Sequence, residues 1–344
     1  MTVSASSPLR RTPAAPAAPG SPGRLRLAVC AATVAACVPY LAIKTAWLSG
    51  STVGWNDADA AQDSALYVGN AISMAMDATA VLVALAFTFP WGRRVPAWLV
   101  LTPMWIAAGL LAPIALAVPL GTVLQVLFSS QPVVDPGGEL QGWVYGVVYT
   151  GFTLQGIGLV AAFVLYARDR WTHVFTVRTE DIPRGATHQL QVLLARTAAV
   201  FAALFAAVHL FWAFGGTAGL IAEEYLSRGP ARQTVDGVMG LLALAAAAAL
   251  LASVGRARRP RRFAVPLAGA WVGAAATFSW SLYLLIVTIA QPGHLGSHST
   301  AAVNMTLLCG LLAGLLMGVT GAVLLAELAE RDVQIASPTA SSTP

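Results

Sequence analysis

The chain has 344 residues, of which 57% are hydrophobic and only 10% are charged, and its mean hydropathy is +0.70. Because a soluble domain carries about 25% charged residues, this composition excludes an ordinary soluble protein and favours one embedded in a membrane. Nineteen of the twenty basic residues are arginine, and they form short clusters between apolar runs. That pattern is typical of membrane topology signals, so the net charge of +5 does not predict nucleic-acid binding.

Eight apolar segments lie between two tails of low complexity. The tails at 1–23 and 333–344 are rich in Ser, Pro and Ala, which predicts disorder. About 20 apolar residues span a bilayer core, and eight segments reach that length: 26–49, 67–91, 96–120, 142–167, 193–214, 234–254, 264–290 and 301–327. The third could extend to Phe128. The first is too long for a signal-peptide core and is interpreted as an uncleaved helix. The predicted fold is therefore all-α, a polytopic membrane protein with eight transmembrane helices.

The charges of the connecting loops predict the orientation of these helices. One set of loops holds nearly all the loop arginines: Arg93, Arg94, Arg168, Arg170, Arg178, Arg184, Arg256, Arg258, Arg259, Arg261 and Arg262. The opposite set holds only two arginines and collects the acidic residues Asp57, Asp59, Asp63, Asp135, Glu139, Glu223 and Glu224. The positive-inside rule assigns the first set to the cytoplasm. We expect a multi-pass protein of the cell membrane with both termini in the cytoplasm.

An internal echo predicts that the membrane region is duplicated. The stretch PYLAIKTAWLSGSTVG at 39–54 is matched by LFAAVHLFWAFGGTAG at 204–219. A shift of 165 positions pairs Trp47 with Trp212, Gly50 with Gly215, Thr52 with Thr217, Gly54 with Gly219, and Lys44 with His209. Four helices followed by four helices return the chain to the same side. The predicted halves, 24–170 and 193–332, are therefore parallel repeats joined by a cytoplasmic linker at 171–192.

Two weaker matches extend this echo to other helices of the halves. MDATAVLVALA, beginning at 76, aligns with VDGVMGLLALA, beginning at 235, and pairs Asp77 with Asp236. Helices four and eight align so that Gly151 and Gly158 fall on Gly314 and Gly321.

Lys44 and Asp77 are the candidate intramembrane polar pair. A charged residue at the bilayer centre costs about 2.5–3.5 kcal/mol on insertion scales and usually finds a partner inside the protein. The two residues lie on consecutive antiparallel helices, so an ion pair lining a polar cavity is one hypothesis. The alternative for Lys44 is snorkelling, in which its ammonium reaches the outer headgroups. Asp77 has too short a side chain for that and is the stronger functional candidate.

His209 and Asp236 are the counterparts in the second half. A pair between them could respond to pH, because free histidine titrates near 6.5. The favoured alternative is a neutral histidine hydrogen-bonded in a helix interface, with Asp236 stabilised near a helix N-terminus by the helix dipole.

Other polar and small residues predict structural roles. No metal or cofactor site is predicted: Asp57, Asp59, Asp63, His294 and His298 could in principle bind a cation, but their spacing matches no metal motif. Cys30, Cys37 and Cys309 lie in apolar segments and predict neither a disulfide nor a zinc site. Gly310, Gly314 and Gly318 form a small-residue face that suits packing within the bundle or, less favourably, an oligomer. The tryptophans lie mostly near the segment ends, where an aromatic belt would place them: Trp47, Trp55, Trp91, Trp98, Trp143, Trp171 and Trp212.

Catalytic motifs are absent from the sequence, which argues against an enzyme. No P-loop, His-Glu-x-x-His or Gly-x-Ser-x-Gly motif occurs, and no residue is assigned to catalysis. The [Lys/His]-x-x-Trp-x-x-Gly-[Ser/Gly]-Thr-x-Gly element, the arginine-only loops and the Ala-rich helices resemble multi-pass membrane proteins of high-GC actinobacteria. That resemblance covers the membrane region and implies no activity, since such proteins generally have none assigned.

Three functions remain open from the sequence. The first is transport of a small solute or ion through a polar cavity near Lys44 and Asp77. The second is a non-transporting envelope scaffold or partner subunit of a membrane complex, which suits the scarcity of intramembrane polar groups. The third, ranked lowest, is a membrane enzyme that uses the acidic and histidine-bearing outer loops.

Overall fold

The structure is a computed structural model, and it describes residues 23–58, 64–132, 138–178, 185–222, 228–255, 262–290 and 299–336. Of the tails at 1–23 and 333–344 that are predicted to be disordered, residues 1–22 and 337–344 lie outside the described residues. Within the described ranges there is no β-strand, only two isolated bridges, which join Trp55 to Leu140 and Arg178 to Arg262.

Eight helices are long and apolar enough to cross a membrane, which confirms the predicted all-α, eight-helix membrane fold. They are α1 (Arg24–Leu48), α2 (Ser64–Thr88), α3 (Ala97–Phe128), α4 (Gly142–Arg170), α6 (His188–Ala213), α8 (Pro230–Gly255), α9 (Ala264–Ala290) and α10 (Ala301–Ala336). Two short elements accompany them, the 3₁₀ turn η2 (Pro90–Arg93) and the helix α5 (Thr172–Thr176).

Several helices are longer than the apolar runs predicted, among them α3, α6 and α10. α3 continues through Pro113 and Pro119 to Phe128, because in apolar surroundings a helix satisfies backbone groups that an irregular segment would leave unpaired. α6 begins at His188, inside the predicted linker, and α10 ends at Ala336, inside the predicted tail.

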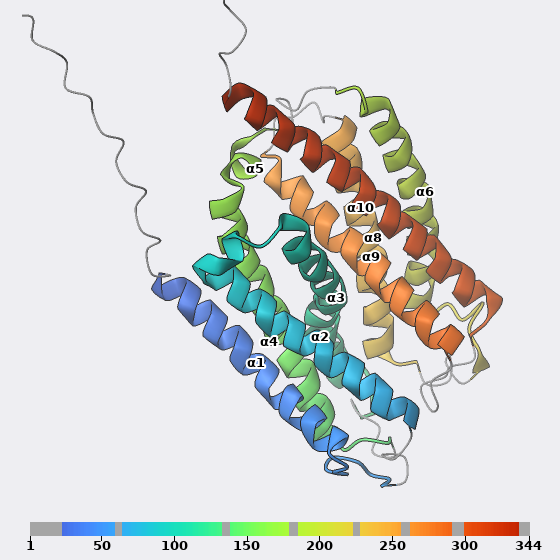
Figure 1. Cartoon of the computed structure of the whole chain (residues 1–344). Coiled ribbons are helices and arrows are strands. Elements are labelled where there is room, and N and C mark those ends of the chain that lie inside the picture. The colour runs from blue at the N-terminus through green and yellow to red at the C-terminus, as the bar shows by residue number, and fades with distance from the viewer. Residues whose placement is uncertain are drawn as a thin grey trace, which may run out of the picture.

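The helices fall into two groups of four that have the same neighbour pattern (Figure 1). In the first group α1 packs against α2 and α4, and α3 packs against α4 and touches α2. In the second group α6 packs against α8 and α10, and α9 packs against α10 and α8. The pattern pairs α1 with α6, α2 with α8, α3 with α9 and α4 with α10.

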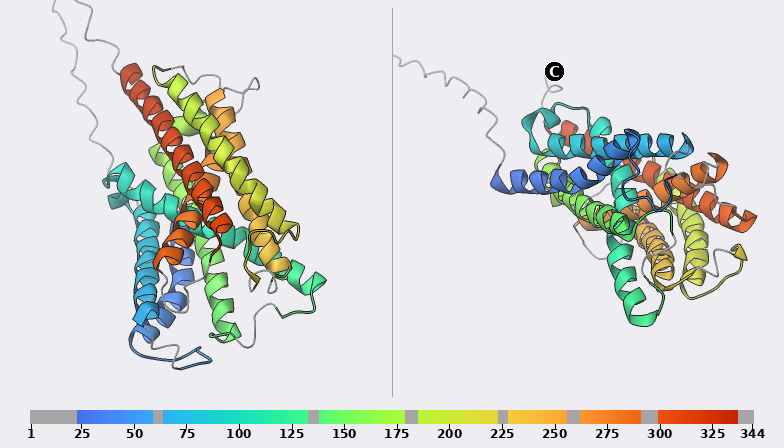
Figure 2. Two further views of the ribbon diagram at one scale, coloured as in Figure 1. Left: turned by 90° about the vertical axis from the view of Figure 1, so that its right-hand side faces the viewer. Right: turned by 90° about the horizontal axis from the view of Figure 1, so that it is seen from below.

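Helix α3 joins the two groups, since it contacts α8 and α9 as well as α4, and it runs obliquely to its neighbours (Figure 2). Gly109 allows the closest approach, because a Cβ at this position would overlap the backbone carbonyl of Ala275 in α9. The Trp105 and Phe278 rings lie 5.1 Å apart, and Trp280 Nε1 donates to the carbonyl oxygen of Leu110 at 3.2 Å.

The cores of the two groups differ in the size of their side chains. Small residues of α6 and α8 dominate the second core, among them Ala198, Ala202, Ala243 and Ala246. Their size lets the helix backbones approach closely, as is common within membranes. Larger side chains fill the first core, among them Phe87, Met104, Leu159 and Tyr166.

One end of the bundle, which we call the arginine end, is tied together by polar contacts between helix termini. Arg26 of α1 and Arg93 of η2 both pair with Asp169 of α4, at 2.6 and 3.2 Å. Arg170 donates to the carbonyl oxygen of Val95 at 3.0 Å. The starts of α1, α3 and α9 and the ends of α2, α4, α8 and α10 lie toward this end (Figure 1).

Candidate functional site

The two echo loops, which leave α1 and α6 at the end opposite the arginines, adopt the same backbone conformation. Gly50, Gly54, Gly215 and Gly219 have φ values of 88°, 81°, 90° and 87°. This left-handed region favours glycine, which explains why glycine stands at each position. No other glycine in the described residues has a positive φ.

The hydrogen bonds of the loops also correspond at the shift of 165. Trp47 Nε1 donates to the carbonyl oxygen of Val53 at 2.8 Å, and Trp212 Nε1 donates to that of Ala218 at 3.1 Å. Backbone N–H groups donate to equivalent carbonyl oxygens in both loops. In the first loop Ser49, Ser51 and Trp55 donate to Thr45, Ala46 and Thr52. In the second loop the corresponding residues Phe214, Gly216 and Leu220 donate to Leu210, Phe211 and Thr217.

Lys44 lies buried, 8% exposed, in an aromatic cage near the end of α1. Its Nζ lies 4.9 Å from the centre of the Tyr40 ring and 4.8 Å from that of Trp47. It donates a 2.5 Å hydrogen bond to Asn70 Oδ1 of α2. Cation–π contacts and a hydrogen bond therefore hold the ammonium inside the protein. Snorkelling toward headgroups is not observed.

His209 occupies the same position in the second half, between Phe205 and Trp212. The centres of these rings lie 4.2 and 5.3 Å from that of the imidazole. His209 Nδ1 lies 2.8 Å from Asp236 Oδ1 in α8, and Arg228 donates to the other carboxylate oxygen. His209 and Asp236 therefore form a buried cluster with Arg228. Asp236 is in the second turn of α8, away from its first N–H groups.

These contacts change the predicted correspondence between the second helices of the halves. Because Lys44 bonds to Asn70 while His209 bonds to Asp236, the spatial counterpart of Asp236 is Asn70. The helix starts agree with this, since Ser64 and Pro230 are separated by the same 166 positions as Asn70 and Asp236. The alignment that paired Asp77 with Asp236 is displaced by seven residues, which is about two helical turns.

The structure does not bring Lys44 and Asp77 together as an ion pair. Asp77 lies seven residues further along α2 than Asn70, which places it about 10 Å deeper at 1.5 Å per residue. Its Oδ1 accepts a 2.6 Å hydrogen bond from Gln155 Nε2 of α4. Within the described part of the chain, Asp77 Oδ2 has no hydrogen-bond partner and no basic group lies at ion-pair distance.

Asp77 is thus a carboxyl group, 4% exposed, near the middle of its helix. Its partner Gln155 is also near the middle of α4, so the pair lies at mid-depth in the first group of helices. Asn70 and Gln155 are uncharged, and no motif in the sequence pointed to them. Tyr40 and Phe205 could have been found, since they are separated by the same 165 positions as Lys44 and His209.

The three glycines of the small-residue face on α10 pack against other helices of the chain. A Cβ at Gly310 would overlap Phe205 of α6, one at Gly314 would meet Phe278 of α9, and one at Gly318 would approach Trp105 of α3. The outer-loop candidates Asp59, Asp63, His294 and His298 lie outside the described residues. In the ranges that are described, no group of three His, Cys, Asp or Glu side chains could hold a metal.

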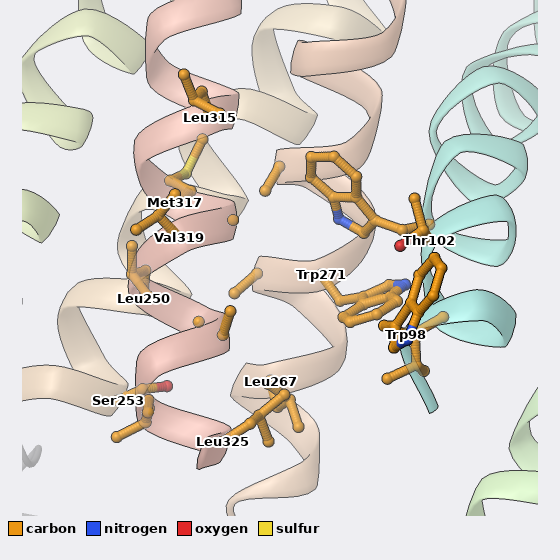
Figure 3. A pocket seen from close by; sticks show the side chains of 18 residues that line it. Trp98, Thr102, Leu250, Ser253, Leu267, Trp271, Leu315, Met317, Val319 and Leu325 are labelled. Carbon is orange, nitrogen blue, oxygen red and sulfur yellow. The ribbon is translucent and has the colours of Figure 1, made fainter. Parts of the chain in front are cut away.

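A pocket of about 490 Å³ lies between α3 and helices α8, α9 and α10 (Figure 3). Figure 3 shows Trp98 of α3 beside Trp271 of α9, facing α10 across the pocket. A second pocket, of about 250 Å³, lies between α3, α4 and α9. Apolar side chains dominate both linings, and neither lining includes Lys44 or Asp77.

Comparison of the chain with models of protein families, with curated proteins and with solved structures found no match.

Proposed function

We propose that this integral membrane protein transports a proton or another small cation, and that Asp77 takes up the ion at mid-depth. One observation carries the proposal: Asp77 is buried, and among the described residues one of its carboxylate oxygens has no partner and no basic group pairs with it. A buried carboxylate without a counter-ion is costly unless it binds a proton or a cation. Lys44 is not part of this site, because its ammonium already bonds to Asn70.

Access to Asp77 requires a second conformation. In the present one Gln155 covers one carboxylate oxygen, and neither described pocket reaches the residue. Separation of α2 from α4 would expose Asp77 to one side of the membrane. The parallel duplication that we infer suits such a motion, since transporters built from repeats rock one group of helices against the other. The matching loops and aromatic cages of the two halves support that duplication.

Flux measurements on the full chain in proteoliposomes test the proposal. Gradients of protons, Na⁺ or K⁺ are imposed, and the arriving ion is followed with an indicator inside the vesicles. We expect one of these ions to move faster than in protein-free vesicles. Asp77→Asn removes the charge at constant size and should reduce the flux to the protein-free level. Asp169→Asn, a matched change at an exposed carboxylate, should preserve it.

Two outcomes would count against transport through Asp77. Wild-type flux in the Asp77→Asn variant would remove Asp77 from the pathway. Flux at the protein-free level for all three ions with the wild-type chain would leave the second candidate function, a non-transporting partner subunit of a membrane complex. That candidate is favoured by the internal pairing of Lys44, His209 and Asp236, which leaves them no ligand-binding role. It predicts that the chain, extracted in mild detergent, migrates with a second protein.

We also infer the orientation and the location of the chain from its charges. The arginine end faces the cytoplasm, both termini lie there, and the membrane is the cell membrane. The support is the concentration of arginines at one end of the bundle and the positive-inside rule.

A further inference from the structure

The two apolar pockets between the helix groups adjoin each other near the arginine end. Leu101, Leu267, Trp271 and Leu325 line both pockets. These residues lie in the first two turns of α3 and α9 and in the last third of α10. From this shared rim the larger pocket extends along α10 to Leu315, and the smaller one extends along α4 to Val160.

The larger pocket opens to the side of the bundle. Trp98 is 68% exposed, and Leu315 and Val319 are also exposed, although all three line the pocket. An opening of this kind meets hydrocarbon in a bilayer. Water is not a suitable occupant, because a buried water needs two to four polar partners and this lining is apolar.

A donor in the shared rim has no acceptor among the described residues. The indole Nε1 of Trp271 is buried and makes no hydrogen bond in the described part of the chain. Trp271 lies seven residues after the start of α9, about 10 Å from that helix end. An ester carbonyl of a phospholipid could accept from this group while its acyl chains extend into the pockets.

Two exposed arginines stand just before the starts of α3 and α9, the helix ends nearest the shared rim. Arg94 precedes α3 by three residues, and Arg262 precedes α9 by two, and both side chains are exposed. The segment 177–178 lies against 262–263, since Phe263 N–H donates to the carbonyl oxygen of Val177 at 3.0 Å. Basic sites between transmembrane helices at the cytoplasmic side suit anionic headgroups.

We propose that this cleft holds one anionic phospholipid, with its two acyl chains in the two apolar pockets and its phosphate-bearing headgroup at Arg94 and Arg262. The site is separate from Asp77 and does not depend on transport. The larger pocket has the volume usual for a bound small molecule. The acyl chains contact the apolar pocket linings, and the arginines select an anionic headgroup. Trp271 donates its N–H to a lipid ester carbonyl where the two pockets meet.

Native mass spectrometry of the full chain in detergent tests this proposal. The protein is mixed with equal amounts of dioleoyl-phosphatidylglycerol and dioleoyl-phosphatidylcholine, and the bound lipid is counted. We expect one retained anionic lipid per chain. The double variant Arg94→Gln, Arg262→Gln should weaken its binding about thirtyfold, since each basic residue near an anionic surface contributes about 1 kcal/mol and every 1.4 kcal/mol is a factor of about ten in affinity. The matched pair Arg24→Gln, Arg196→Gln lies exposed on α1 and α6, which contribute to neither pocket lining, and should bind as the wild type does.

A second pair of variants separates the pocket from the surrounding surface. Ala322 is exposed and lines the larger pocket, whereas Ala326, one turn further along α10, lines neither. Ala322→Phe should therefore displace the lipid, and Ala326→Phe should retain it. Equal retention of the two lipids would overturn the headgroup assignment, and a lipid-bound Ala322→Phe variant would overturn the pocket assignment. A lipid-free dimer would show that a second copy fills the cleft and would also overturn the proposal.

Discussion

At the scale of single residues, Lys44 and His209 show how one position can be stabilised in two ways. Each lies between an aromatic residue four positions earlier and a tryptophan three positions later, and each bonds to the second helix of its half. The lysine bonds to a neutral amide and lies between two aromatic rings. The histidine bonds to a carboxylate that also pairs with Arg228.

The buried Asp236–Arg228 pair leads to a prediction about stability. Asp236→Asn preserves the shape of the side chain but leaves a guanidinium that is only 7% exposed without its carboxylate. Breaking a buried pair in this way costs about 3–5 kcal/mol in the free energy of unfolding. Thermal unfolding in detergent should show a large loss of stability. Asp169→Asn is the control, since its carboxylate is 49% exposed and an exposed pair contributes less than about 1 kcal/mol. Similar losses in both variants would contradict the assignment.

Sequence reasoning located Lys44, His209 and Asp236 but not all their contacts, for a physical reason. Asn70 and Asp77 are seven residues apart and lie on nearly the same face of α2, because seven residues make about two helical turns. Helical periodicity therefore cannot distinguish them as partners of Lys44. Only the depth at which α1 and α2 cross decides between them, and that depth depends on the length and conformation of the loop. The charge of Asp77 drew attention to it, whereas the amides of Asn70 and Gln155 carried no comparable signal.

At the scale of elements, apolar length and turn chemistry were sufficient to predict most of the fold. The eight spans follow from length and hydropathy, and the positive φ of Gly50 and Gly215 accounts for the echo of the loops. The oblique course of α3 was not predictable in this way. It depends on the close approach of α3 to α9, which arises from the fit of particular side chains.

Gly109 should control that approach. Its Cβ would overlap the carbonyl oxygen of Ala275, so Gly109→Ala forces the two backbones apart. Overpacking of this kind costs about 1–3 kcal/mol, and the variant should unfold at a lower temperature than the wild type. Gly69→Ala makes the same change in α2, where nothing lies within 4 Å of the added methyl group. We expect it to be neutral or stabilising by up to about 1 kcal/mol, because alanine is the better helix former. A Gly109→Ala variant as stable as Gly69→Ala would mean that α3 and α9 are not held by this contact.

At the scale of the whole molecule, the arginines concentrate at one end of the bundle, whereas the membrane-spanning region buries its polar side chains in the interior. The exposed faces of the helices are apolar, with Phe128, Phe214 and Ile289 among the most exposed side chains. Among the described residues, the buried Lys, His and Asp side chains occur at two depths: Lys44, His209 and Asp236 lie near the end opposite the arginines, and Asp77 lies at mid-depth. The two halves share the caged position, whereas Asp77 and Gln155 belong to the first half alone. This asymmetry makes Asp77 the residue that the correspondence between the two groups of helices does not explain.

The orientation of the molecule can be tested without changing any charge. Thr52 is exposed in the first echo loop and Ala186 is exposed before α6, at the opposite end of the bundle. A cysteine at Thr52 should react with a membrane-impermeant maleimide in intact cells. A cysteine at Ala186 should react only after permeabilisation, because the positive-inside rule places the arginine end in the cytoplasm. The wild-type chain sets the background, since Cys30 and Cys37 are buried and Cys309 lies within α10. Labelling of both variants after permeabilisation establishes that each thiol is accessible. Labelling of the cysteine at Ala186 but not of that at Thr52 in intact cells would invert the assigned orientation and leave the eight-helix fold unchanged.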